Sequence, residues 1–206
     1  MALVKYNNNS ISTISSAGQL ASGSLVPIKT LTASSSSTLS FVDGSNGVVL
    51  DNTYPIYKFE FINCHPATNN VTFGFQANAS GGSGYNETMT TTNFRAYNFE
   101  SNSGGLDYIA DNDQAQGTGF QIICGDVGNV SDENIVGEMF LFSPSSTTFV
   151  KHFMSRFVGN ASSDYAIDMY TAGYFNTTSA IDEIQFKMSS GNIDSGKIKL
   201  YGIKDS

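Results

Sequence analysis

Charged residues are scarce in this sequence of 206 residues: only 14% are Asp, Glu, Lys or Arg, whereas about a quarter is usual in soluble domains. The net charge is −8, and the ten Lys and Arg residues are scattered along the chain. Nucleic-acid binders concentrate cations to neutralise phosphates, and acidic membrane surfaces attract clustered cations. The sequence therefore argues against nucleic acid and acidic membrane surfaces as partners.

Long apolar runs and helical periodicity are also missing. No run approaches the roughly 20 apolar residues of a transmembrane helix. Met1 to Val4 are followed at once by Lys5 and a tyrosine–asparagine stretch, so the apolar centre of a signal peptide is absent. No window sustains an i, i+3, i+4, i+7 apolar stripe over the length of a helix. We expect a protein made in the cytoplasm, without a signal peptide, membrane insertion or sizeable helices.

Groups for nucleophilic or metal chemistry are few. The only histidines are His65 and His152, and the only cysteines are Cys64 and Cys124. Cys64 and His65 are adjacent, so in a strand they point to opposite faces and form no nucleophile–base pair. Nothing in the sequence supports pairing Cys124 with His152, and no known catalytic motif occurs. The sequence predicts no enzyme, cofactor or metal site.

The two cysteines each follow an apolar run. We interpret both as buried free thiols that act as small hydrophobic side chains. A disulfide between them is the alternative, because pairing is not readable from sequence.

Alternation with a period of two is the dominant pattern of the chain. Ile184, Phe186 and Met188 alternate with polar residues, and after a turn-rich connector over 189–196 so do Ile198 and Leu200. Two such runs joined by a Gly- and Ser-bounded loop predict an antiparallel hairpin with one buried face.

Similar runs recur along the chain and predict about ten short strands. The other expected strands are Leu25–Thr32, Val48–Leu50, Ile56–Ile62, Val71–Phe75, Phe94–Phe99, Phe120–Cys124, Ile135–Phe142, Phe149–Val158 and Tyr165–Met169. Pro27 makes the first an edge strand. Aromatic residues of the Ile56 and Val71 runs are expected to pair across neighbouring strands. The fold class is all-β, an antiparallel β-sandwich over residues 24–206.

Residues 1–23 differ from the rest, being rich in Asn, Ser and Ala. Their sparse apolar residues are Leu3, Val4, Ile11, Ile14 and Leu20. One interpretation is a disordered terminus. The other is a short N-terminal arm that docks through these apolar residues onto a partner or a sister subunit.

Two long polar connections, over 78–93 and 101–119, contain residues suited to binding. The candidates are Tyr85, Tyr97, Tyr108, Asp107, Asp111 and Asp113. Exposed tyrosines beside Asn, Asp and Ser suit carbohydrate or protein recognition, although packing within the loops explains any single one as well. The three acids suit Ca²⁺ in principle, but they lack the EF-hand spacing, so we interpret them as a solvated acidic loop.

Several segments resemble a known group of proteins. They are Ser40–Gly44 with Gly47–Leu50, Tyr54–Phe59, Ser143–Thr148 with Val150–Phe153, Ala172–Ile181, Ile184–Lys187, Ser190–Gly196 and Ile198–Lys204. In this order they resemble virion structural proteins, some tail-fibre-like, of tailed bacteriophages from marine hosts. The resemblance covers about residues 25–204 and includes no catalytic motif.

The resemblance implies a jelly-roll-like sandwich on the virion surface, made in the host cytoplasm and assembled as a homo-oligomer, with a trimer favoured. Larger relatives carry a longer N-terminal docking part, so the short arm here favours a capsid decoration, a short fibre or a knob that contacts other virion proteins. A tail-fibre adhesin for a host surface glycan or protein is the alternative. A stand-alone carbohydrate-binding β-sandwich is the third hypothesis.

Overall fold

A computed structural model describes residues 24–205 and confirms the all-β class. It contains thirteen strands and one 3-10 helix. The elements are β1 (Leu25–Thr32), β2 (Leu39–Val42), β3 (Ile56–Pro66), β4 (Val71–Ala79), β5 (Met89–Phe99), β6 (Gly104–Tyr108), η1 (Ala110–Asn112), β7 (Ala115–Gly117), β8 (Gln121–Val127), β9 (Ile135–Phe142), β10 (Lys151–Ala161), β11 (Tyr165–Phe175), β12 (Ile181–Met188) and β13 (Ile193–Ile203). The expected N-terminal arm, with Leu3, Val4, Ile11, Ile14 and Leu20, lies outside the described residues.

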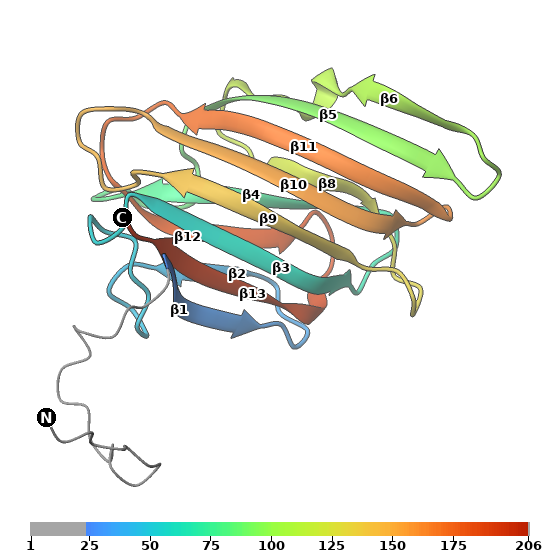
Figure 1. The fold of residues 1–206 in the computed structure, drawn as a ribbon, viewed down its shortest axis with the longest axis horizontal. Coiled ribbons are helices and arrows are strands. Elements are labelled where there is room, and N and C mark those ends of the chain that lie inside the picture. The colour runs from blue at the N-terminus through green and yellow to red at the C-terminus, as the bar shows by residue number, and fades with distance from the viewer. Residues whose placement is uncertain (1–23, 206) are drawn as a thin grey trace, which may run out of the picture.

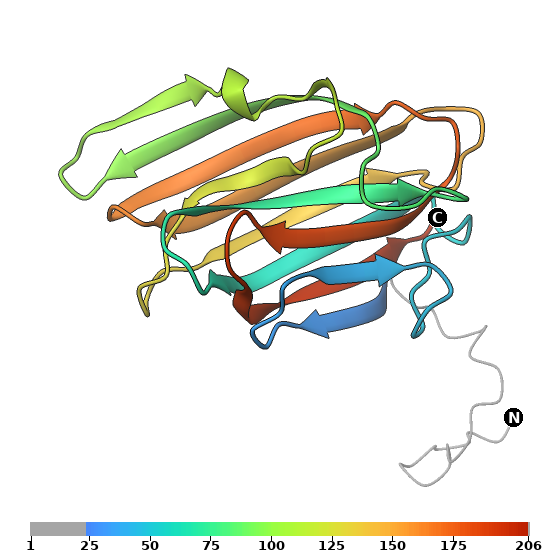
Figure 2. The same cartoon turned by 180° about the vertical axis from the view of Figure 1, so that it is seen from behind.

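All described strand pairs are antiparallel and belong to one sheet, in the order β1-β13-β3-β9-β10-β8-β4-β12-β2. The sheet curls back on itself, so that β2, β12 and β4 lie behind β13, β3 and β9 (Figures 1 and 2). β10 joins the two halves at a single register pair, Ala161 with Val127 of β8. The two ends of this strand order, β1 and β2, are not paired with each other. The sheet therefore forms a barrel that is nearly closed, with its gap between β1 and β2.

On the edge of β10 that faces away from β9, the sheet continues beyond the barrel. β11 pairs with β10 along its whole length, β5 pairs with β11, and β6 forms the outer edge on β5. Figure 1 shows β10, β11, β5 and β6 continuing beyond the barrel as a broad blade.

Aromatic rings fill the space between the two halves of the sheet. Phe41 of β2 meets Phe59 of β3 edge-on at 5.3 Å, and Phe75 of β4 meets Phe153 of β10 at 4.9 Å. Phe186 of β12 lies at the centre of the cluster. It contacts the rings of Phe41, Phe59, Phe61, Phe73 and Phe75. This core connects both halves because each strand presents every second side chain inward.

The predicted C-terminal hairpin is wrong in its pairing. β12 and β13 are strands with one buried face, as expected. However, β12 pairs with β4 and β2, whereas β13 pairs with β1 and β3. The connector between Met188 and Ile193 carries the chain from one half of the curled sheet to the other, because each strand buries its apolar face against the opposite half.

The same correction applies to the runs that begin at Ile56 and Val71. They form β3 and β4, which are not hydrogen-bonded neighbours. Their aromatic residues still meet, with Phe61 and Phe73 edge-on at 5.8 Å, but across the core. The alternation of apolar and polar residues determines which face of a strand is buried, but it does not determine which strand pairs with it.

The expected strand over 48–50 is also wrong. These residues have no strand conformation, although Val48 and Leu50 are buried. Their backbone bonds are local: Val48 N donates to Ser45 O at 2.9 Å, and Leu50 N donates to the Asp43 carboxylate at 2.8 Å. A loop that folds on its own turn thus buries these two side chains without joining the sheet.

Each of the two long connections expected to be loops contains strand residues. β4 continues to Ala79 and β5 begins at Met89. The polar start of β5 is buried and internally bonded, since Thr91 donates to Gln121 at 2.7 Å and Asn93 donates to Thr171 at 2.6 Å. Likewise 101–119 contains β6, η1 and β7. These polar residues have the composition of a loop, yet they are found in strands because their side chains form hydrogen bonds with one another inside the protein.

Candidate functional site

The three tyrosines proposed for binding lie in different settings. Tyr85 is in the β4–β5 connection, where its hydroxyl donates to Glu183 at 2.8 Å and burial raises its pKa. Tyr97 faces inward and packs against the core. Tyr108 is exposed, and its hydroxyl donates to the Asp113 carboxylate. Only Tyr108 therefore presents an open aromatic surface.

The acidic residues do not converge on a cation site. Asp107 lies 3.8 Å from Arg95 Nε, and the Arg95 guanidinium lies 5.2 Å from the Tyr97 ring centre. Asp113 accepts the Tyr108 hydroxyl, and Asp111 lies within η1. Within residues 24–205 no group of three or more His, Cys, Asp or Glu side chains is placed to hold a metal ion.

The cysteines are buried free thiols, as predicted. Burial raises the pKa of both Cys64 and Cys124 to about 12. Cys124 lies in the core, whereas His152 is exposed on β10, so these residues are not brought together. Both thiols remain protonated at neutral pH, a state of low nucleophilicity.

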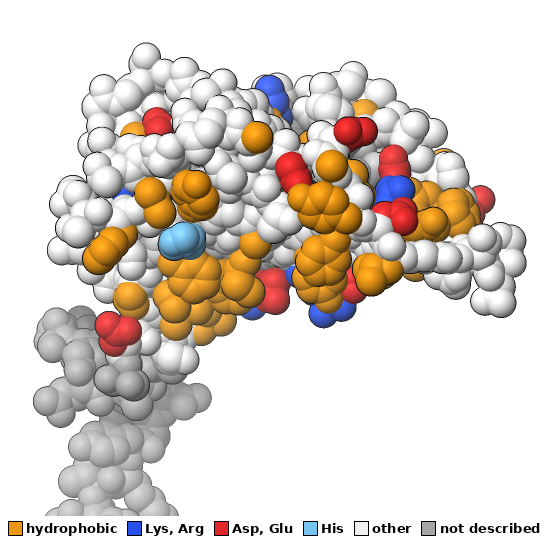
Figure 3. Space-filling model, turned by 90° about the horizontal axis from the view of Figure 1, so that it is seen from above, with side chains coloured by type: hydrophobic (Ala, Val, Ile, Leu, Met, Phe, Trp, Pro, Cys, Tyr) orange, Lys and Arg blue, Asp and Glu red, His pale blue; other side chains and the backbone are white. Residues whose placement is uncertain are grey.

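One face of the blade carries most of the exposed apolar surface. Among the described residues, six of the nine large exposed hydrophobic side chains lie on it. They are Leu106 and Tyr108 of β6, Phe94 of β5, Met154 and Val158 of β10, and Val136 of β9. We call the outward side of β6, β5, β11, β10 and β9 the apolar face. Figure 3 shows hydrophobic side chains gathered along one side of the molecule.

Strand register brings these side chains into rows across the apolar face. Phe94 is opposite Tyr170, and their rings stack at 4.9 Å and 4°. The next row has the small Ala172 opposite Thr92 and Met154. Small side chains beside large ones create two adjoining hollows of about 390 and 440 Å³, which share Thr92, Met154 and Ala172. The apolar face is thus wide and uneven enough to interlock with another surface.

Charges bordering the apolar face are already paired. Arg156 makes two hydrogen bonds to Asp168, at 2.9 and 2.7 Å, and lies over the Tyr170 ring. Lys58 lies 3.0 Å from both Glu60 and Glu138. Two cations and three carboxylates leave one net negative charge here, out of −8 for the chain. This face is therefore nearly neutral.

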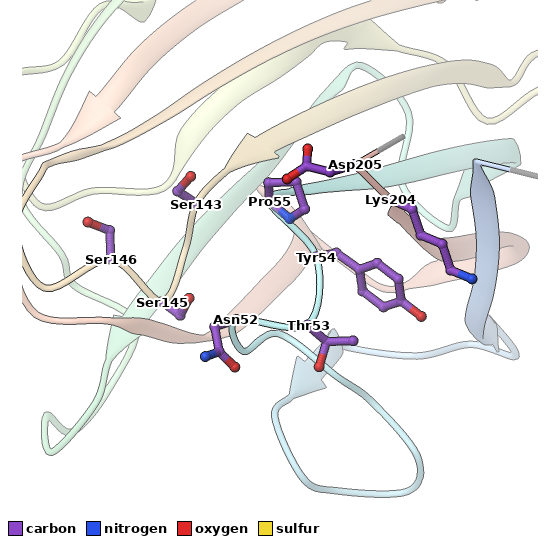
Figure 4. A pocket seen from close by; sticks show the side chains of 9 residues that line it. All are labelled: Asn52, Thr53, Tyr54, Pro55, Ser143, Ser145, Ser146, Lys204 and Asp205. Atoms are coloured by element: carbon purple, nitrogen blue, oxygen red, sulfur yellow. The ribbon is translucent and has the colours of Figure 1, made fainter. Parts of the chain in front are cut away.

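A hollow of about 550 Å³ lies at one end of the barrel, and we call it the cup. Three separate segments line it: residues 52–55 before β3, residues 143–146 after β9, and residues 204–205 after β13. Figure 4 shows their side chains around the hollow, with the Tyr54 ring projecting from its loop. Most of the residues that line it carry a hydroxyl or amide group, and the Tyr54 ring and Pro55 add apolar surface.

Sequence reasoning missed both surfaces. The apolar face has a signal, because 135–142 and 153–158 carry apolar residues on both sides of the strand, for example Phe153 and Met154. Such strands are either buried on both faces or expose one apolar face that binds a partner. The cup has no comparable signal, since its three segments are brought together only by folding.

Comparisons with protein-family models, curated proteins and solved structures found no match for this chain. Within the described part of the chain, no helix has the length and apolar character required to cross a membrane. The fold and surfaces thus define an antiparallel all-β protein with an exposed apolar face.

Proposed function

We propose that this protein is a non-enzymatic structural protein of a tailed-phage particle, which assembles with copies of itself through the apolar face. The observation that carries the proposal is the concentration of exposed hydrophobic side chains on β6, β5, β11, β10 and β9. Apolar patches of this kind on a soluble protein mark interaction surfaces. The near neutrality of the face supports self-association, because two identical copies of a protein with a charge of −8 repel elsewhere.

The resemblance to virion proteins adds the location on the particle and favours a trimer. We also propose that the two halves of the curled sheet form a jelly-roll-like sandwich. The ring contacts between β2, β4 and β12 on one side and β3 and β10 on the other support that description. The first 23 residues would then connect the sandwich to other virion proteins.

Met154→Asp tests the assembly surface. Met154 lies opposite both Ala172 and Phe140 and is 50% exposed, so the substitution adds a charge to the face without opening the core. We expect the native chain to form an oligomer and the variant to associate about 100-fold more weakly, as when a central interface residue is lost. Light scattering coupled to size-exclusion chromatography measures both masses against the 22.0 kDa chain.

Thr30→Asp is the matched control. It adds the same charge at an exposed strand position on β1, away from the apolar face. The control should assemble like the native chain. A native chain that remains monomeric, or equal loss of assembly in both variants, would contradict the proposed surface.

Antibody labelling of intact particles tests the location. Label over the head supports a decoration, and label on the tail or its fibres supports a knob or fibre. Particles without label would refute a virion role while leaving the assembly surface to be judged by its own experiment.

A receptor-binding adhesin is the second candidate, and the two hollows beside Phe94, Tyr170 and Tyr174 favour it. Aromatic rings around a hollow suit sugar or peptide recognition. In this case the apolar face would remain free in the mature assembly, and host-cell binding rather than assembly would be lost in Met154→Asp.

A further inference from the structure

The cup has the construction of a small-ligand site. Its volume of about 550 Å³ falls within the range of roughly 300–1,000 Å³ in which proteins bind small molecules. It lies on other segments than the apolar face, so assembly through that face and binding in the cup are separate properties.

The walls of the cup are fastened to one another and to the barrel. Ser143 N donates to Pro55 O at 2.7 Å, which joins the loop before β3 to the turn after β9. Ile181 N donates to Pro144 O at 2.9 Å and ties that turn to β12. On the other side the Tyr54 ring lies directly over Gly202 and meets Tyr57 edge-on at 5.7 Å. A ligand would thus meet preformed walls, which reduces the entropy lost on binding.

The polar groups of the cup are open to a ligand. The Asn52 amide and the hydroxyls of Ser143 and Ser145 make no hydrogen bond to another described residue. Thr53, by contrast, already has a partner: its backbone N–H donates to the Asp51 carboxylate at 2.8 Å. Hydrogen bonds from Thr53 lower the pKa of that carboxyl. Hydroxyl and amide groups both donate and accept, which matches a ligand whose own groups do both.

Charge narrows the class of ligand. Among the described residues of the lining, Lys204 is the one cation and Asp205 the one carboxylate, so this part of the lining carries no net charge. A single carboxylate is too few for a hard cation, and one matched cation gives no preference for an anion. The ligand that fits is neutral, rich in hydroxyls and equipped with an apolar C–H face for the Tyr54 ring.

We infer that the cup is a binding site for a neutral sugar residue. The hydroxyls of the sugar bond with Asn52, Ser143 and Ser145, and one face of its ring packs near Tyr54. A single shallow site of this kind binds weakly, and several copies in one oligomer raise its avidity.

Nuclear magnetic resonance titration of the full chain tests the inference. The probes are glucose, galactose, mannose and N-acetylglucosamine at millimolar concentrations, with inorganic phosphate as the anionic comparison. We expect saturable shifts of the amides of 52–54 and of Ser143, Ser145 and Ser146 with at least one sugar. No saturable shift with any of the four sugars, shifts elsewhere, or stronger binding of phosphate would overturn the inference.

Asn52→Ala supplies the specific variant, and we expect it to leave the fold intact because Asn52 is exposed. We expect sugar affinity to fall about fivefold, the effect of losing one hydrogen bond. Asn98→Ala, the same substitution at an exposed position of β5, should bind normally. Unchanged affinity in Asn52→Ala would exclude the cup. Met154→Asp should bind sugar like the native chain, so failure of assembly and failure of sugar binding are read separately.

Discussion

Replacing Phe186 with alanine is expected to lower the free energy of unfolding by about 4 kcal/mol, a typical cost for removing a fully buried Phe. Phe186 is 0% exposed and its ring meets five others, the nearest being Phe61 at 5.0 Å. Those rings belong to β2, β3 and β4, so they come from both halves of the curled sheet. The substitution leaves a cavity where the halves meet, because rings fixed on separate strands collapse only partly into the space.

Urea unfolding followed by circular dichroism measures the change. A loss of this size in a chain of this length also lowers Tm by about 10 °C. Phe149→Ala is the matched control, since the same atoms are removed from a side chain that is 72% exposed. We expect that control to stay within about 0.5 kcal/mol of the native chain. Equal losses in the two variants would show that the centre of the core lies elsewhere.

Gly196→Ala is expected to be comparably damaging, through the backbone rather than the core. Gly196 lies in β13 at a register shift and has a φ of +120°, which other residues rarely adopt. A Cβ atom there would lie 2.7 Å from both Asn63 O and Cys64 Cα of β3. These are main-chain atoms, so relief requires the two paired strands to move apart. Backbone strain and overpacking of about 1–3 kcal/mol each give an expected loss of about 4 kcal/mol.

Gly44→Ala separates the two contributions. Gly44 also has a positive φ, of +71°, but its Cβ atom would have no neighbour within 4 Å. Only the left-handed conformation is penalised there, at about 1 kcal/mol. Urea unfolding of both variants decides the matter: a Gly196→Ala variant no less stable than Gly44→Ala would mean that β3 and β13 are not held as closely as their register indicates.

The sequence by itself determined the fold class and most of the strands. Alternation of Ile184, Phe186 and Met188 with polar residues is a local property, and a strand exposes it directly. Burial of the two cysteines also followed from the apolar runs before them. These features were predictable because each depends on residues close together in the chain.

The tertiary structure alone decided which strands pair and where the surfaces lie. β12 and β13 are consecutive and alternate in the same way, yet they belong to opposite halves of the sheet. The polar residues 90–93 form strand because Thr91 and Asn93 find partners on β8 and β11. The cup likewise combines three segments that are far apart in sequence. The physical reason is common to all three cases. The chemistry of a side chain determines whether it is stable when buried or hydrogen-bonded, but only the folded chain determines which residues it packs against or bonds to.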